Sequence, residues 1–158
     1  MKTHAQAVVI GGGVIGCSIL YHLTKLGWKD VILLERDELT SGSTWHAAAG
    51  IHGLHDSTNI SRIQHYTMNL YKELEAETGQ GCGIFQPGSL YLAQTEKRSN
   101  QLQLQAAKAK LYGMNFSEIN REHAEELHPL VDFTGIHTIM WEPEGGNVDP
   151  SGVTAAYA

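Results

Sequence analysis

Three glycines near the start of the chain have the spacing of a dinucleotide-binding turn. Gly11, Gly13 and Gly16 form a Gly-x-Gly-x-x-Gly pattern directly after the apolar residues 7–10. The first glycine permits a tight turn, the second lets the backbone approach a pyrophosphate, and the third lets a helix pack closely on a strand. Free N–H groups and the positive dipole end of that helix bind phosphate oxygens. The contacts predicted at this turn are Gly11, Gly13, Val14, Ile15 and Gly16.

An acidic residue follows the next apolar run at the position that the dinucleotide pattern requires. Glu35 ends the run at residues 31–35, and Arg36 comes directly after it. A carboxylate here accepts hydrogen bonds from ribose hydroxyls and repels a 2′-phosphate, which argues against NADP. The two residues join the predicted cofactor contacts. This pattern alone does not distinguish FAD from NAD, so an NAD-dependent dehydrogenase is one alternative.

The hydrophobic pattern places these residues on a β-α-β unit at about residues 5–36. Residues 7–10 and 31–35 are short apolar runs typical of strands in a parallel sheet. Residues 14–26 predict a helix, which Gly27 is placed to end. The apolar face predicted for this helix consists of Ile15, Ile19, Leu23 and Leu26. A strand, a helix and a parallel strand in this order predict an α/β, Rossmann-like fold.

The rest of the chain predicts a mixture of helices and strands. The predicted helices are residues 59–77, 96–112 and 120–127, with another beginning at residues 149–151. In the helix at residues 59–77, the buried side is predicted to carry Ile63, Leu70 and Leu74. Residues 135–141 have strand character, and residues 84–85 and 89–93 are predicted to form a hairpin around Gln86-Pro87-Gly88. We find one β-α-β unit, and a parallel sheet needs further strands. We therefore expect the chain to be the N-terminal part of a larger protein.

A loop rich in small residues follows Arg36 and contains one chemically distinctive side chain. The neutral imidazole of His46 is a competent nucleophile at physiological pH. Hydroxyl groups of Ser43 and Thr44 can form hydrogen bonds with a ligand, and the small residues 47–50 let backbone N–H groups approach it. Spacing by itself favours the alternative of a packed loop histidine beside Trp45.

The segment Gly42-Ser43-Thr44-Trp45-His46-Ala47-Ala48-Ala49-Gly50 resembles the glycine-oxidase-like (D-amino-acid-oxidase-type) family of FAD-dependent oxidoreductases, and within it the branch of dimethylglycine and sarcosine dehydrogenases. The likeness continues through residues 70–75, 77–79, 86–89 and 149–150. It implies that residues 1–158 are the N-terminal part of a Rossmann-like FAD-binding domain with part of an α+β substrate domain. It also implies a flavin covalently joined to His46, within a flavin-attachment loop at about residues 37–55. One departure is Ala49, where the family pattern usually has glycine.

By this resemblance, the cofactor contacts are the β-α-β residues named above together with Gly42, Ser43, Thr44, Trp45, His46, Ala47, Ala48, Ala49 and Gly50. The implied activity is oxidation, and hence demethylation, of a small N-methylated amino acid such as dimethylglycine or sarcosine. An electron-transfer flavoprotein would accept the electrons, and tetrahydrofolate would take part only through a C-terminal domain beyond residue 158. No catalytic residue is assignable in this segment. The second alternative is a truncated, non-catalytic dinucleotide-binding module.

Composition and spacing exclude several other classes of function. A net charge of -6 argues against non-specific binding to nucleic acid. No apolar stretch approaches the roughly 20 residues of a membrane helix, and the first residues lack a signal-peptide pattern, so we expect a cytoplasmic protein that binds no membrane. His46, His52 and His55 lack a recognised zinc spacing, so no metal site is predicted. Cys17 lies within an apolar helical pattern, which predicts a buried, reduced thiol.

Overall fold

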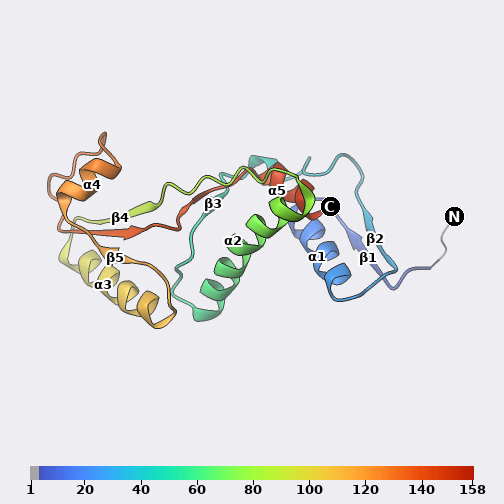
Figure 1. Ribbon diagram of the computed structural model, residues 1–158, viewed down its shortest axis with the longest axis horizontal. Helices are drawn as coiled ribbons and strands as arrows, with labels where there is room; N and C mark the ends of the chain where they lie inside the picture. The colour runs from blue at the N-terminus through green and yellow to red at the C-terminus, as the bar shows by residue number, and fades with distance from the viewer. Residues whose placement is uncertain (1–3) are drawn as a thin grey trace. The chain divides into compact units, whose positions relative to one another are not determined.

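A computed structural model describes residues 4–158, which form two compact units (Figure 1). Unit 1 contains the residues up to Ala49 together with Asn69–Phe85 and Asn147–Ala158, and unit 2 contains Gly50–Met68 and Gln86–Gly146. The helix α2 (Thr58–Thr78) contributes residues to both units. Each unit is therefore discontinuous in sequence.

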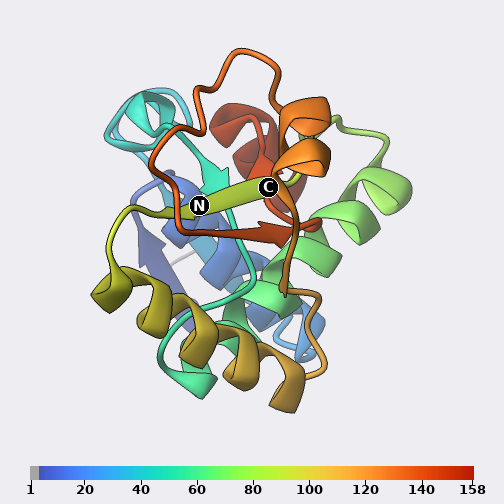
Figure 2. The ribbon, with the colours of Figure 1, turned by 90° about the vertical axis from the view of Figure 1, so that its left-hand side faces the viewer.

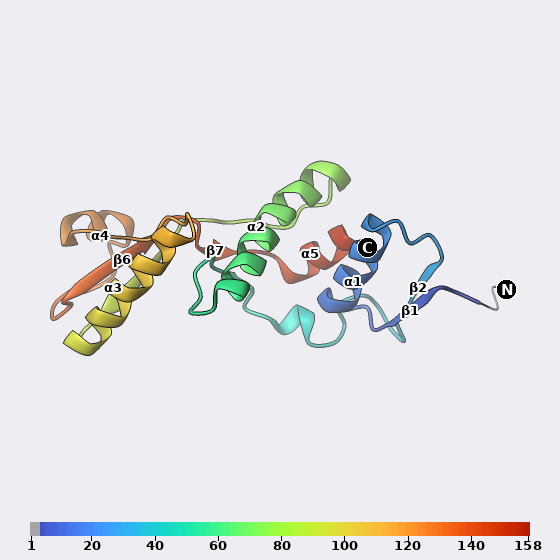
Figure 3. The ribbon, with the colours of Figure 1, turned by 90° about the horizontal axis from the view of Figure 1, so that it is seen from below.

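Unit 1 contains the predicted β-α-β unit. Strands β1 (Ala7–Ile10) and β2 (Val31–Leu34) pair in parallel, and α1 (Val14–Lys25) packs against both of them (Figure 3). The register places Ile10 opposite Leu34, so the carboxyl ends of the two strands lie side by side. Gly27 follows the helix with a φ of +90°, a conformation that glycine adopts readily. The predicted α/β fold of this region is confirmed.

The face of α1 that packs within unit 1 is not the one predicted from hydrophobic periodicity. The side chains of Ile15 and Leu26 are 72% and 77% exposed, whereas Gly16 and Cys17 are buried. Small residues let the helix approach its neighbours closely, and α1 packs against the helix α5 (Pro150–Tyr157). The apolar stripe of isoleucines therefore remains outside the core of this unit.

Both cysteines lie in the core of unit 1 as free thiols, as predicted for Cys17. They belong to a buried cluster that also contains Leu70, Leu74, Val153, Ala156 and Tyr157. Burial is the main cause that raises the pKa of Cys82 to about 11, so this thiol stays protonated at neutral pH. The prediction that Leu70 and Leu74 are buried is thus confirmed. The same prediction for Ile63 is wrong, because its side chain is 60% exposed.

Unit 2 is built on an antiparallel sheet in the order β4-β6-β5. The strands are β4 (Ser89–Ala93), β5 (Ser117–Glu118) and β6 (Thr138–Glu142). Figure 2 shows α3 (Glu96–Leu111) on one side of this sheet and α4 (Arg121–Leu127) on the other. Separate buried clusters lie on the two sides, one with Met140 and Leu102 and one with Ile139 and Ala124. The sheet is therefore covered on both faces, and two of its strands lie far apart in the sequence.

The predicted hairpin around Gln86-Pro87-Gly88 is wrong. Strand β4 pairs with β6 rather than with residues 84–85, and Phe85 forms a bridge with Asn147 instead. Gly88 has a φ of +87°, and a Cβ atom there would lie 1.7 Å from the Trp141 ring. Gly88 thus allows this segment to lie close to Trp141 on β6, which is distant in the sequence. The remaining short elements are a 3-10 helix at Thr44–His46, β3 (Gly50–Ile51) and β7 (Gly146–Asn147).

None of the helices in the described part of the chain is both long and apolar enough to span a bilayer.

Candidate functional site

Backbone geometry requires glycine at two positions of the predicted turn, Gly11 and Gly16. Gly11 has a φ of +113°, which residues with a side chain rarely adopt. A Cβ atom on Gly16 would lie 1.8 Å from the carbonyl oxygen of Gly11, so only glycine lets α1 begin this close to the strand. A Cβ atom on Gly13 would lie 2.9 Å from Oγ1 of Thr44. Gly12 was not singled out from the sequence, yet a Cβ atom there would lie 2.6 Å from Leu39.

The start of α1 carries N–H groups suited to an anion. The intrahelical bonding begins with the N–H of Cys17, which donates to the carbonyl oxygen of Gly13 at 3.0 Å. The preceding N–H groups of Ile15 and Gly16 therefore have no acceptor within the helix. The N–H of Val14 donates to Oγ1 of Thr44 at 3.0 Å. That hydrogen bond ties the predicted flavin-attachment loop to the end of the helix predicted to bind pyrophosphate.

Hydrogen bonds from the backbone hold the Glu35 carboxylate beyond the end of β2. Its Oε2 accepts from the N–H of Gly12 at 2.6 Å, and its Oε1 accepts from the N–H groups of Arg36 at 2.7 Å and Asp37 at 3.1 Å. These backbone donors, that of Gly12 first, hold the pKa of Glu35 below its ordinary value. The carboxylate is thus ionised at neutral pH, and its one remaining lone pair, on Oε2, can accept from a ribose hydroxyl.

A cavity of about 350 Å³ lies beside this carboxylate, at the carboxyl ends of β1 and β2. Its lining residues are Ile10, Gly11, Leu34, Glu35, Arg36, Asp37, Ser41 and Gly42. Gly11, Glu35, Arg36 and Gly42 were predicted as cofactor contacts, and the structure brings them together here. Ile10 and Leu34 were missed, although each ends a predicted parallel strand, where ligands bind in open α/β sheets. The cavity, the glycine turn and the fixed carboxylate together fit the adenosine and pyrophosphate parts of a dinucleotide.

We expect replacement of Glu35 by glutamine to lower stability near neutral pH but not in acid. Because the folded pKa of Glu35 is depressed, its stabilising contribution is full above the unfolded pKa of about 4.3 and is lost as the pH falls through the lower folded pKa. The difference in melting temperature between the wild type and Glu35→Gln should therefore be constant near neutrality and shrink below about pH 4. Thermal unfolding followed across this range measures it, and a difference that grew in acid would contradict the assignment.

The predicted nucleophile lies on an exposed turn. Thr44–His46 form the 3-10 helix, and His46 is exposed. Its ring centroid lies 3.9 Å from that of Trp45, with 34° between the ring planes. The alternative of a packed histidine predicted this contact, but the Trp45 side chain is itself 57% exposed. The imidazole therefore rests against an aromatic ring at the surface of unit 1 and is accessible to a ligand.

Ala49 has the left-handed backbone conformation that glycine favours. Its φ is +52°, and its carbonyl oxygen accepts from the N–H of Val148 at 3.1 Å. The left-handed conformation costs a residue with a side chain about 1 kcal/mol. The departure from glycine at this position thus leaves the backbone conformation in place. The neighbouring predicted contacts Ser43, Ala47 and Ala48 are exposed along the same loop, and Gly50 is exposed at the start of β3.

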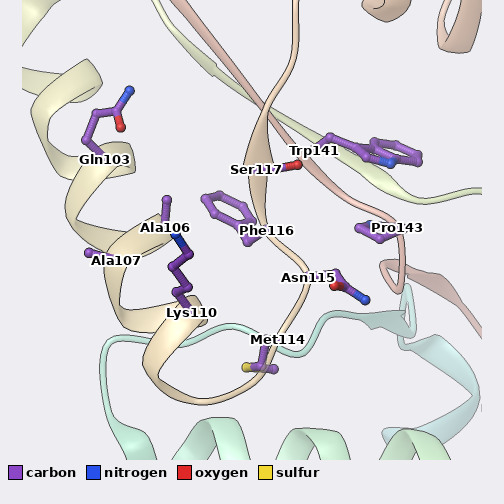
Figure 4. Close-up of a pocket in the computed structure, with 10 residues that line it drawn as sticks. All are labelled: Gln103, Ala106, Ala107, Lys110, Met114, Asn115, Phe116, Ser117, Trp141 and Pro143. Atoms are coloured by element: carbon purple, nitrogen blue, oxygen red, sulfur yellow. The ribbon is translucent and has the colours of Figure 1, made fainter.

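A second cavity, of about 700 Å³, lies in unit 2. Figure 4 shows that its lining comes from α3, the segment at residues 114–117 and the end of β6. None of the predicted cofactor contacts lines it. Within residues 4–158, no three His, Cys, Asp or Glu side chains lie close enough together to hold a metal ion. The predicted residues that the structure gathers around one cavity are therefore Gly11, Glu35, Arg36 and Gly42, all in unit 1.

Comparison with known proteins gives consistent matches along the whole chain. The family described as DAO, FAD dependent oxidoreductase, matches residues 6–158. Mitochondrial dimethylglycine dehydrogenase of Rattus norvegicus is 41% identical over 157 residues, which cover 99% of this chain and 18% of that protein. Mitochondrial sarcosine dehydrogenase of Homo sapiens is 36% identical, with 100% of this chain and 17% of that protein covered. The crystal structure of L-proline dehydrogenase from P. horikoshii superposes with a TM-score of 0.90 at 28% identity, covering 100% of this chain and 41% of that one.

Proposed function

The chain belongs to the DAO family of FAD-dependent oxidoreductases, and from that premise we propose that it forms the dinucleotide-binding part and the flavin-attachment loop of an enzyme that oxidises a small N-methylated amino acid. The family and the fold class predicted from the sequence are thereby confirmed. The chain spans less than a fifth of the length of the curated relatives that it matches, since it covers 18% of the first of them. The activity of the whole protein is accordingly our proposal.

The observation that carries the proposal is the 41% identity to a dimethylglycine dehydrogenase across 157 residues. A sarcosine dehydrogenase is 36% identical over 159 residues. Both names describe oxidation of an amino acid that bears a methyl group on nitrogen. The similarity includes the first β-α-β unit and the loop that follows it, rather than the glycine turn alone. An N-methylated amino acid is therefore the substrate class that these relatives support.

The residues of unit 1 supply the groups that such an enzyme needs to bind FAD. The first turn of α1 would hold the pyrophosphate through the N–H groups of Ile15 and Gly16. Glu35 would accept from a ribose hydroxyl in the cavity at the ends of β1 and β2. Bound FAD supplies the hydride-accepting chemistry, and the protein binds and orients it. The cavity contains no side chain that we assign to proton transfer with the substrate.

We extend the proposal to a covalent bond between His46 and the flavin. A ring nitrogen of His46 would lose its proton and bond to the 8α-methyl carbon, which loses a hydride equivalent to the electron acceptor of the enzyme. The exposure of the imidazole supports this role, because a nucleophile must be reached by its target. The expected electron acceptor is an electron-transfer flavoprotein, and the expected compartment is the cytoplasm. Tetrahydrofolate is a further expected partner where a C-terminal domain is present.

Acid precipitation of the full-length protein tests the proposal. We expect a yellow precipitate with flavin equimolar to protein, and turnover of dimethylglycine or sarcosine with an artificial electron acceptor. Colour released into the supernatant would support FAD binding and contradict the covalent bond. A colourless protein that reduces NAD would establish the first alternative. Bound flavin without turnover of any N-methylated amino acid would favour the non-catalytic module.

A further inference from the structure

A buried carboxylate in unit 2 has no cationic partner among the residues that the structure describes. The side chain of Glu142, the last residue of β6, is 2% exposed. Its Oε1 accepts from the N–H groups of Gly53 at 2.6 Å and Leu54 at 3.3 Å, and its Oε2 accepts from the hydroxyl of Tyr91 at 2.6 Å. The ion pairs recorded between residues 4 and 158 do not include it. Three neutral donors therefore surround this carboxylate.

A carboxylate in such a place is not explained by packing. Removing an ionised group from water is costly, and replacing it with an apolar side chain of similar size is often neutral or stabilising. Hydrogen bonds to a charged acceptor are, however, shorter and stronger than neutral ones. Burial and the hydrogen bond to Glu142 raise the pKa of Tyr91, so its hydroxyl keeps the proton that it donates. What the carboxylate provides is a fixed position for the backbone that donates to it.

The loop residues on the other side of this contact, Gly53 and Leu54, are themselves buried. A Cβ atom on Gly53 would lie at an ordinary contact distance of 3.5 Å from Oε1 of Glu142. The next residues are also held, because Ser61 Oγ accepts from the N–H of His55 at 2.8 Å and donates to its carbonyl oxygen at 3.1 Å. The segment 53–55 is thus fixed through its main chain.

Two exposed imidazoles lie at the borders of this fixed segment. Nε2 of His52 lies 3.2 Å from Nε2 of Gln64. Nδ1 of His55 accepts from the N–H of Ser57 at 3.0 Å, which places the proton of the neutral ring on Nε2. The backbone that bears both rings therefore depends on the hydrogen bonds to Glu142 and Ser61.

We propose that Glu142 is a positioning residue that holds the end of the flavin-attachment loop at Gly53 and Leu54, together with the neighbouring His52 and His55, in the arrangement that turnover requires. The inference rests on the proposed function, because only that function gives the loop a place in a reaction. Glu142 acts through the loop backbone and is itself too deeply buried to meet a substrate.

The test uses the full-length flavoprotein with Glu142→Gln and Glu142→Leu. Glutamine keeps one carbonyl oxygen for the two N–H groups, whereas leucine keeps none. We expect amide hydrogen exchange at Gly53 and Leu54 to accelerate by about tenfold or more in Glu142→Leu, and by less in Glu142→Gln. We expect kcat to fall in the same order, by about tenfold or more for leucine, with the flavin content unchanged.

Glu118→Gln is the matched control, because Glu118 is an exposed acid on the same sheet whose Oε2 accepts from the side chain of Gln103. It should leave the exchange and kcat unchanged. The inference is overturned if folded, flavin-bearing Glu142→Leu has wild-type exchange at Gly53 and Leu54, or wild-type kcat. If the wild type itself carries no flavin, the proposed function fails instead, and the exchange measurement still tests the contact at Glu142. A loss of kcat in Glu142→Leu with uniformly faster exchange through α3 would show general unfolding and would also overturn it.

Discussion

Gly16→Ala is expected to abolish FAD binding and to destabilise the protein by about 3 kcal/mol. The added Cβ atom would lie 1.8 Å from the carbonyl oxygen and 3.0 Å from the carbonyl carbon of Gly11. Both are backbone atoms of the turn, so no side chain can move aside to relieve the overlap. The helix would have to shift away from β1, which displaces the N–H groups of its first turn from the pyrophosphate. Urea unfolding and the flavin content of the purified full-length protein measure the two effects.

Gly81→Ala provides the control for this substitution. A Cβ atom at Gly81 would have no neighbouring atom within 4 Å, and the residue also belongs to unit 1. We expect its unfolding free energy to stay within about 0.5 kcal/mol of the wild type. A Gly16→Ala protein that kept its flavin and unfolded like the wild type would show that the close approach of α1 to the strand does not form the cofactor site.

His46→Ala is expected to abolish the covalent attachment of the flavin completely. The bond needs a ring nitrogen, and alanine offers no nucleophile in its place. Non-covalent FAD binding should persist, because the glycine turn and Glu35 are unchanged. Because His46 is exposed, we expect a change in stability within about 0.5 kcal/mol. Flavin fluorescence of the denatured protein on a gel measures the attachment directly, and the acid supernatant should then contain the released FAD.

His52→Ala is the matched control for attachment, since it removes another exposed histidine of the same loop. Its flavin should remain joined to the chain. A denatured His46→Ala protein that still fluoresces would place the bond on a different residue. Loss of attachment in His52→Ala but not in His46→Ala would show that the wrong histidine was chosen, whereas a wild type without bound flavin would show that the wrong cofactor was chosen.

Several features followed from residues that are close together in the sequence. The glycine spacing, the apolar runs and Glu35 predicted the β-α-β unit and its ligand, because turn geometry and helix start are decided within a few residues. The ends of later helices followed in the same way. Thr95 accepts from the N–H of Arg98 at the start of α3, and Asp149 accepts from the N–H groups of Ser151 and Gly152 at the start of α5. These hydrogen bonds join residues two or three apart.

Other features depended on contacts between distant residues. Strand β4 pairs with β6 rather than with the residues that precede it in the sequence, and α1 buries its small residues rather than its isoleucines. Glu142 accepts a hydrogen bond from the backbone N–H of Gly53. By itself, then, the sequence determined the family, the cofactor class and the local geometry around the glycine turn. The tertiary structure decided which strand pairs with which, which helix face is buried and where the end of the loop is held. The physical reason is that local conformation depends on sterics and hydrogen bonds between near neighbours in the sequence. Strand pairing and helix burial depend instead on the relative free energies of alternative long-range contacts.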